Sequence, residues 1–287
     1  IDEIEQGLEP DRVQHLVNVL SKYEDKQIII TTHSSNVIVE IPCTSLFIMR
    51  KGSYNLQHVE GEMQGCIRKN PEAFFARKII VCEGATEIGF CRSINEYRIS
   101  HNKTSASCMG IRFADGAGNE MINYVLGFKD LSYPTALFCD SDCVNINNRK
   151  QEFRDLEINV IDSEDNCSIE QQVFKDVPWN VVKALIKIAI EKVIDDDGKT
   201  YEEAEKKIFD ATNAQLDCKM AQMTNWYQNE SDDLRTELGL AARNKNWYKK
   251  QTYGERMGRC ILTSYSDLAE SCRLKFIIDS ISNWIDA

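Results

Sequence analysis

The chain has 287 residues, of which 43% are hydrophobic, and a formal net charge of −11. This length allows one large domain or two to three smaller ones, and no stretch reaches the roughly 20 apolar residues of a membrane span. The acidic excess excludes DNA binding over the whole surface, so any such contact must be local or assisted by a metal. The eleven cysteines include no CxxC pair, which favours a reduced cytoplasm over a disulfide scaffold or a zinc ribbon.

The first sixty residues alternate between helix and strand patterns. The spacing of apolar residues predicts a helix over residues 11–23 and a buried strand over residues 27–32. Residues 45–60 alternate about a Lys51-Gly52-Ser53 turn, which predicts a hairpin. Residues 61–71 follow as the expected linker.

This order resembles the second half of an ABC-type ATPase head. Asp2 matches the Walker B aspartate, Glu3 the catalytic glutamate, residues 7–10 the D-loop and His33 the switch histidine. For His33 the alternative is a polar cap on the next helix. The resemblance implies an incomplete half-site for ATP and Mg²⁺. Because no G-x-x-x-x-G-K-[ST] loop and no LSGGQ-like signature occurs, we expect no ATP hydrolysis by this chain alone, and we expect that it is truncated at its N-terminus.

A predicted strand and turn bring two carboxylates together. Residues 79–82 are an apolar run typical of a strand buried on both faces of a parallel sheet. Glu83 follows it, a glycine allows a sharp turn, and the next helix carries Glu87 in its first turn. Such a pair needs a cation, and Mg²⁺ prefers oxygen ligands. Alternatively, the acids only favour a helix N-terminus.

More carboxylates follow two later strands. The apolar run over residues 135–139 ends in Asp140-Ser141-Asp142, and both aspartates can face one site because alternate residues of an extended segment point the same way. A strand predicted over residues 157–161 leads to an acidic run that contains Asp162. Acidic runs are usually solvated loops, but this strand would bring the run to the same sheet edge.

The ordered pair of motifs Glu83-x-x-x-Glu87 and Asp140-x-Asp142 resembles the Toprim domain of topoisomerases, DnaG-type primases and nucleases of the OLD (overcoming lysogenization defect) family. Ser168-x-Glu170 resembles the S-x-E ligand pair of OLD nucleases, and we favour Glu170 over Asp162 as the ligand. The predicted metal ligands are Glu83, Glu87, Asp140, Asp142, Ser168 and Glu170. Five carboxylates suit two Mg²⁺ or Mn²⁺ ions, an arrangement that supports phosphodiester cleavage.

A glycine-rich turn lies between the two acidic motifs. The strand predicted over residues 110–114 leads to Asp115-Gly116-Ala117-Gly118-Asn119, and a helix is predicted over residues 119–131. The turn could offer backbone amides to a phosphate. An ordinary strand-to-helix turn is the favoured alternative.

The chain from Pro178 onward has a helical pattern. We predict helices over residues 181–193, 201–216, 232–242 and 266–285, with residues 195–198 as a solvated acidic turn. The segment 243–259 holds six basic residues and one acid, interleaved with aromatic residues. It is a plausible DNA groove, with the candidate DNA-binding residues Arg243, Lys245, Lys250, Arg256 and Arg259. The alternative is an amphipathic segment with solvated cations and core aromatic side chains.

Part of this segment resembles the lysine-bearing end of OLD-family enzymes. The match covers Trp247-Tyr248-Lys249 and the later Gly254-Glu255-Arg256-Met257-Gly258. The resemblance implies that Lys249, or alternatively Lys250, stabilises the charge that develops on the phosphate.

As a whole the chain resembles the C-terminal half of an OLD-family ATP-dependent nuclease, and among its relatives the Gabija-type anti-phage nucleases most. The resemblance implies an α/β fold: a partial ABC-ATPase segment over residues 1–62, a Toprim core with a mostly parallel, Rossmann-like sheet over residues 63–177, and a helical region over residues 178–287 that completes the nuclease site.

The implied function is metal-dependent nicking or cleavage of duplex phage or plasmid DNA, with Glu83 activating water and ATP regulating the full-length protein. The resemblance further implies a bacterial cytoplasmic homo-oligomer with a UvrD-like helicase partner. The alternatives are a non-catalytic or partner-dependent DNA-sensing subunit, or another Toprim enzyme of the topoisomerase or primase kind.

Overall fold

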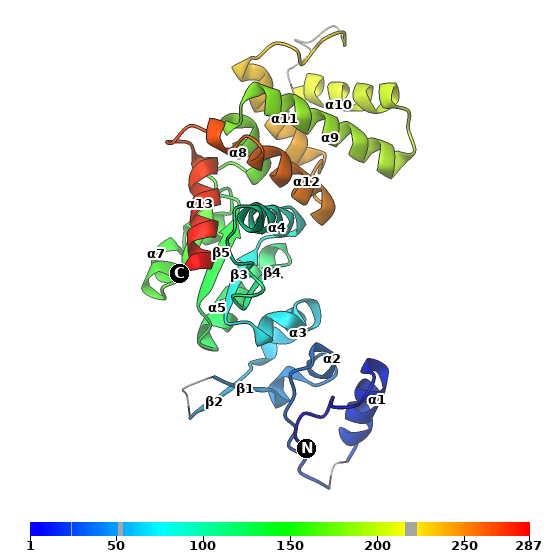
Figure 1. The fold of residues 1–287 in the computed structure, drawn as a ribbon, viewed down its shortest axis with the longest axis vertical. Helices are drawn as coiled ribbons and strands as arrows, with labels where there is room; N and C mark the ends of the chain where they lie inside the picture. Colours follow the sequence, from blue (N-terminus) through cyan, green and yellow to red (C-terminus); the bar gives the residue numbers. More distant parts are fainter. Residues whose placement is uncertain (24, 51–53, 216–222) are drawn as a thin grey trace.

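The structure is a computed structural model that describes residues 1–23, 25–50, 54–215 and 223–287. The molecule is elongated, with the N-terminal segment at one end, a parallel sheet in the middle and a group of helices at the other end (Figure 1). The predicted Lys51-Gly52-Ser53 turn lies outside the described residues, as does Leu216 at the end of a predicted helix.

Four parallel strands form the central sheet, in the order β4-β3-β5-β6. They are β3 (Lys78–Cys82), β4 (Ile111–Asp115), β5 (Thr135–Cys139) and β6 (Asn159–Asp162). Each lies where the apolar runs predict it. The strands are parallel, so their carboxyl ends meet at one edge of the sheet. Glu83 and Asp140 follow β3 and β5 at that edge, and β4 is the outer strand beside β3.

Alternate residues of the strands enter two separate cores. Ile80, Cys82 and Phe138 point to one face, where they pack with α4 (Ala85–Ser100) and the C-terminal helices. Ile79 and Val81 point to the other face, which α3 (Gln64–Lys69), α5 (Met121–Asp130), α6 (Val144–Asn147) and α7 (Lys150–Asp155) cover. The result is a three-layer α/β/α arrangement, which confirms the predicted α/β fold with a parallel sheet flanked by helices.

Helix α8 (Ile169–Asp176) follows the sheet, and the described part of the C-terminal region then forms the helices α9 (Trp179–Asp197), α10 (Tyr201–Gln215), α11 (Asp232–Asn244), α12 (Gln251–Leu262) and α13 (Arg273–Asp286). Helix α12 was not predicted. Its residues Tyr253, Met257 and Ile261, four positions apart, are buried against the rest of the region. Residues 195–198 are exposed, as predicted, but Asp195, Asp196 and Asp197 form the last turn of α9, and only Gly198 lies beyond the helix. Asp196 and Asp197 form ion pairs with lysines.

The prediction that residues 61–71 form a linker is wrong, because these residues are folded against the sheet. These residues form a 3₁₀ turn (Gly61–Met63), helix α3 and the start of a second 3₁₀ turn (Pro71–Phe75). Met63, Cys66 and Ile67 are buried in the core beneath the sheet. Apolar side chains at these positions therefore fix the segment to the sheet.

The N-terminal segment has a small core of its own, built from Ile4, Val13, Val17 and Val37. Helix α1 spans Pro10–Leu20 and α2 spans Ser35–Ile38, while β1 (Phe47–Met49) and β2 (Leu56–His58) form the predicted antiparallel hairpin. Residues 27–32 are extended but not a strand, contrary to the prediction. They form backbone hydrogen bonds with residues 1–4; for example, the Thr31 N–H donates to the Ile1 carbonyl at 2.9 Å.

Candidate active site at the carboxyl edge of the sheet

The turn from β3 to α4 holds the first two predicted carboxylates. The Gly84 N–H donates to Glu87 Oε2 at 2.9 Å, so Glu87 does cap its helix, as the structural alternative predicted. Glu83 Oε2 accepts a hydrogen bond from the Asp140 N–H at 3.0 Å. The ends of β3 and β5 are thereby joined through a carboxylate, and the two acidic motifs lie at one place.

The start of α8 completes the same cluster. Asp140 is buried, and its Oδ1 accepts a hydrogen bond from the Ile169 N–H at 2.7 Å. Glu170 is 0% exposed, and neither of its carboxylate oxygens has a hydrogen-bond partner. The Ser168 hydroxyl caps α8 by accepting from the Gln171 N–H at 3.3 Å. Glu170 is therefore a buried acid that faces the other acids without a donor of its own.

Burial and mutual repulsion keep protons on this cluster. Burial, then the charges of Glu170 and Glu83, raise the pKa of Glu87 to about 8. Burial, then the charges of Glu87 and Glu170, raise the pKa of Asp140 to about 9. Carboxylates this close cannot all ionise unless a cation neutralises them. The cluster therefore takes up either protons or cations near neutral pH.

The two candidate lysines point in different directions. Desolvation would lower the pKa of Lys249, but the carboxylates led by Glu170 and Glu87 outweigh it and raise that pKa. Lys250 instead pairs with Asp196 of α9 and stands at the N-cap of α12. Of the two cations, Lys249 is the one that interacts with the carboxylate cluster.

Glycines let α12 lie unusually close to α4. A Cβ added to Gly254 would come within 2.6 Å of the Thr86 carbonyl oxygen, and one added to Gly89 within 2.6 Å of the Glu255 nitrogen. The Thr86 hydroxyl donates to the Tyr248 carbonyl at 3.1 Å. This close packing connects the residue before Lys249 to the helix turn that carries Glu87.

Two other acids are already paired with arginines and a lysine. Asp142 pairs with Arg243, a residue predicted to bind DNA. Asp162, the competing candidate for a metal ligand, contacts Lys150 at 2.5 Å and Arg273 at 2.7 Å. Asp162 is thus neutralised from two sides, whereas Glu170 is not.

The chemistry of these residues fits a divalent cation, although their present arrangement does not form a coordination shell. In the described part of the chain, no group of three or more His, Cys, Asp and Glu side chains is placed so that it could hold a metal ion. Glu83, Glu87 and Asp140 instead accept hydrogen bonds from backbone N–H groups. The oxygens of Glu170 are the ones in this cluster that have no hydrogen-bond partner.

The glycine-rich turn after β4 does not offer a phosphate site. The Gly116 N–H donates to the Cys82 carbonyl at 2.7 Å, and the Gly118 N–H to the Glu83 carbonyl at 2.9 Å. The Ala117 N–H donates to Asp115 Oδ1 at 2.8 Å. With its amides engaged, the turn is an ordinary strand-to-helix connection that holds β4 against the end of β3.

The segment 243–259 is not an aromatic DNA groove. Trp247, Tyr248 and Tyr253 are all buried, which leaves no faces for bases to stack on. Most of the cations predicted to bind DNA pair with acids of the protein: Arg243 with Asp142, Lys250 with Asp196, Arg256 with Glu191, and Arg259 with Glu96, while Lys245 is exposed. The alternative of an amphipathic segment is therefore correct for the aromatic side chains, which lie in the core, but most of the cations are in ion pairs and not only solvated.

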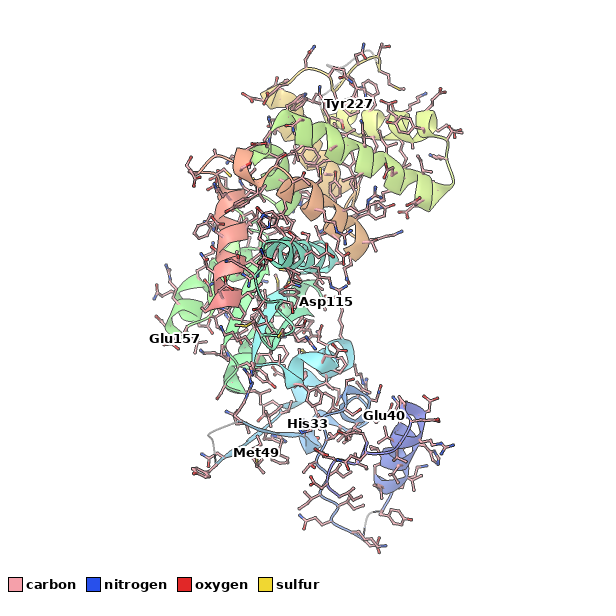
Figure 2. All side chains as sticks on the ribbon, in the orientation of Figure 1. His33, Glu40, Met49, Asp115, Glu157 and Tyr227 are labelled. Atoms are coloured by element: carbon pink, nitrogen blue, oxygen red, sulfur yellow. The ribbon has the colours of Figure 1, made fainter. Side chains whose placement is uncertain are left out.

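The residues that resemble an ATPase site lie together but far from the carboxylates. Thr31 donates its hydroxyl to Asp2 and accepts from the Glu3 N–H at 2.8 Å. Glu5, which the sequence did not single out, accepts from the His33 N–H at 2.7 Å. Figure 2 shows His33 in the N-terminal part of the elongated molecule and Asp115 in its middle.

Two stretches of the chain match known families. Residues 74–142 match the TOPRIM domain of overcoming lysogenization defect protein-like sequences. Residues 1–40 match an AAA domain family associated with the AbiEii toxin of a type IV TA system. No curated protein matches the chain significantly.

Two solved structures are similar to this chain. The C-terminal region of the Xanthomonas campestris pv. campestris OLD protein is 15% identical, with a TM-score of 0.42 over 75% of this chain and 94% of that chain. The C-terminal region of the Burkholderia pseudomallei OLD protein is 13% identical, with a TM-score of 0.36 over 74% of this chain and 99% of that chain.

The parallel sheet with acids at its carboxyl edge defines a Toprim domain, a class that typically binds divalent metal ions. The family matches make that domain one of the OLD-like kind and place an AAA-type segment, which implies nucleotide binding, before it. The predicted resemblance to the OLD family is thereby confirmed, while the closer likeness to Gabija-type anti-phage nucleases stays a prediction. No helix in the described ranges is both long and apolar enough to cross a membrane.

Proposed function

We propose that the chain is the nuclease part of a metal-dependent DNA endonuclease that nicks or cleaves by phosphodiester hydrolysis. One observation carries this proposal: Glu170 is buried beside Glu87 and Asp140 with both carboxylate oxygens unpartnered. Burying an unpaired carboxylate among other acids is costly. A site with that cost is expected where a cation is bound for function.

Five carboxylates of this chain would hold two Mg²⁺ or Mn²⁺ ions: Glu83, Glu87, Asp140, Asp142 and Glu170. When bound, such ions supply charge stabilisation for the attacking and leaving oxygens. In this proposal Glu83, which accepts a hydrogen bond from the Asp140 N–H, accepts the proton of the attacking water. The ammonium group of Lys249 donates hydrogen bonds to the phosphate oxygens and stabilises their developing charge.

A topoisomerase-like reaction is disfavoured by the environment of Tyr248, the residue before Lys249 in the chain. Tyr248 is fully buried, and its hydroxyl donates to the Leu185 carbonyl at 2.8 Å. Burial raises its pKa well above the usual value. This hydroxyl therefore cannot act as a nucleophile on DNA. Regulation by ATP and a role in anti-phage defence stay predictions from the resemblance.

The test is nicking of supercoiled plasmid in Mg²⁺ or Mn²⁺ by the wild-type protein, Glu83→Gln, Lys249→Met and the matched control Lys250→Met. We expect the first two variants to lose nicking and Lys250→Met to keep it, because Lys250 pairs with Asp196 away from the carboxylates. Nicking without a metal ion, or full nicking activity of Glu83→Gln, would refute the proposal. Equal losses in the two lysine variants would remove the role of Lys249.

A further inference from the structure

A groove of about 750 Å³ runs between helix α4 and the edge strand β4. Its volume lies within the range of about 300–1,000 Å³ that is usual for ligand sites. Ile88 and Gln251 line one part of it, next to Glu87 and two residues after Lys249 in the chain. Two segments that carry candidate site residues, the first turns of α4 and the start of α12, therefore also contribute to the lining of this groove.

Three basic side chains line this groove: Lys69, Arg92 and Arg112. Each is 40% exposed or more and pairs with one acid: Asp115 at 2.9 Å, Glu255 at 3.4 Å and Glu72 at 3.5 Å respectively. Exposed pairs of this kind contribute only about 0–1 kcal/mol. These cations can therefore exchange their present partners for an anionic ligand at little cost.

The edge strand adds a backbone donor. The Ile111 N–H donates to the Ala106 carbonyl at 2.8 Å, and the Asp115 N–H donates to Asn70 Oδ1 at 2.7 Å, both on the side away from β3. Because backbone groups alternate in direction along a strand, the N–H of Phe113 faces the same side, between these two. Phe113 lines the groove, so its N–H can donate to a ligand there.

We infer that this groove holds the single nucleic-acid strand that flanks the scissile phosphate; the inference rests on the proposed function. A sugar-phosphate backbone is a row of anions, and cationic side chains with backbone N–H groups are its usual partners. The lining has three basic and two acidic side chains in a chain with a net charge of −11. The groove thus takes over the DNA contact that the sequence assigned to residues 243–259.

The test is fluorescence anisotropy of a labelled single-stranded oligonucleotide, measured over a range of salt concentrations. All proteins carry Glu83→Gln so that the strand is not cut. One carries Arg92→Gln with Arg112→Gln; its matched control carries Arg256→Gln with Arg259→Gln. We expect the groove pair to weaken binding about tenfold and to lower the slope of log Kd against log salt by about 1.4, since each contact to a single strand contributes about 0.7.

The control pair is expected to bind within twofold of the parent. Unchanged binding by the groove pair, or an equal loss in both pairs, would overturn the inference. Plasmid nicking by proteins with an intact Glu83 separates it from the proposed function. If wild-type protein nicks and the groove pair binds like the control, only the groove is refuted. If the groove pair alone loses affinity and wild-type protein never nicks, the groove binds a nucleic-acid strand but the proposed nuclease function, and with it the position of that strand beside a scissile phosphate, is refuted.

Discussion

Adding one methyl group to α12 should separate Lys249 from the carboxylates. The Cβ of Gly254→Ala would lie 2.6 Å from the Thr86 carbonyl oxygen and 3.0 Å from the Thr86 Cα. Both are backbone atoms, so no flexible side chain can yield. To restore an ordinary contact of 3.4 Å, the two helices must move apart by about 0.8 Å.

This movement is expected to affect activity more than stability. Overpacking costs about 1–3 kcal/mol, but alanine is favoured over glycine inside a helix by about 1 kcal/mol, so the net destabilisation is about 0–2 kcal/mol. The hydrogen bond of 3.1 Å from Thr86 to the Tyr248 carbonyl would stretch. A misplacement of about 1 Å can cost about 100-fold in rate.

Urea unfolding and plasmid nicking measure the two effects separately. The matched control is Gly61→Ala, because a Cβ at Gly61 meets nothing within 4 Å. We expect the control to keep both its unfolding free energy and its nicking rate. If Gly254→Ala unfolds and nicks like the wild-type protein, the close contact of α12 with α4 does not position Lys249.

Three further predictions concern the carboxylates. Glu170→Gln removes a charge that repels Glu87 and Asp140 and raises their pKa values, so it should raise the melting temperature of the metal-free protein. The same variant should abolish Mn²⁺ binding in calorimetry, and retained binding would contradict this. The folded-state pKa values of about 8 and about 9 exceed the ordinary values of these two acids, so the folded state holds more protons than the unfolded state between about pH 4 and pH 9. Their stabilising contribution is therefore full at low pH and is lost as the pH rises. The urea concentration at the unfolding midpoint of metal-free protein should decrease between pH 5 and pH 9 and should recover with Mn²⁺. A midpoint that increases with pH would refute the raised pKa values of these two acids. Arg243→Ala frees Asp142 from an exposed ion pair worth up to about 1 kcal/mol and should tighten Mn²⁺ binding by up to about fivefold; weaker binding would count against Asp142 as a ligand.

The sheet and the order of its acids could be predicted because both depend on local patterns. Strands buried on both faces read as continuous apolar runs, so residues 78–82 and 135–139 stand out in the sequence. Parallel strands bring their carboxyl ends to one edge, which predicts that Glu83 and Asp140 meet. No knowledge of distant packing is needed for either step.

The surroundings of the site depend on contacts between distant parts of the chain. Arg243 pairs with Asp142, 101 positions away, and Lys250 with Asp196, 54 positions away. In the sequence these cations appear as a basic stretch, because their acidic partners lie elsewhere. The buried faces of Trp247 and Tyr253 are likewise set by helices that pack only in the folded chain. Helix α12 was missed for this reason.

The core on the α4 face of the sheet has a consequence for how such proteins can evolve. This core is one cluster of buried side chains that contains both Ile80 of β3 and Ile285 of α13. In addition, buried Arg98 of α4 pairs with Asp286 at 2.6 Å. The N-terminal segment has a small core around Ile4, Val13, Val17 and Val37, but its Ile38, Cys43 and Val59 belong to the core on the other face of the sheet. A recombination event that separated the Toprim sheet from the helices that follow would therefore divide a single core. Sheet and C-terminal helices should be inherited as one unit.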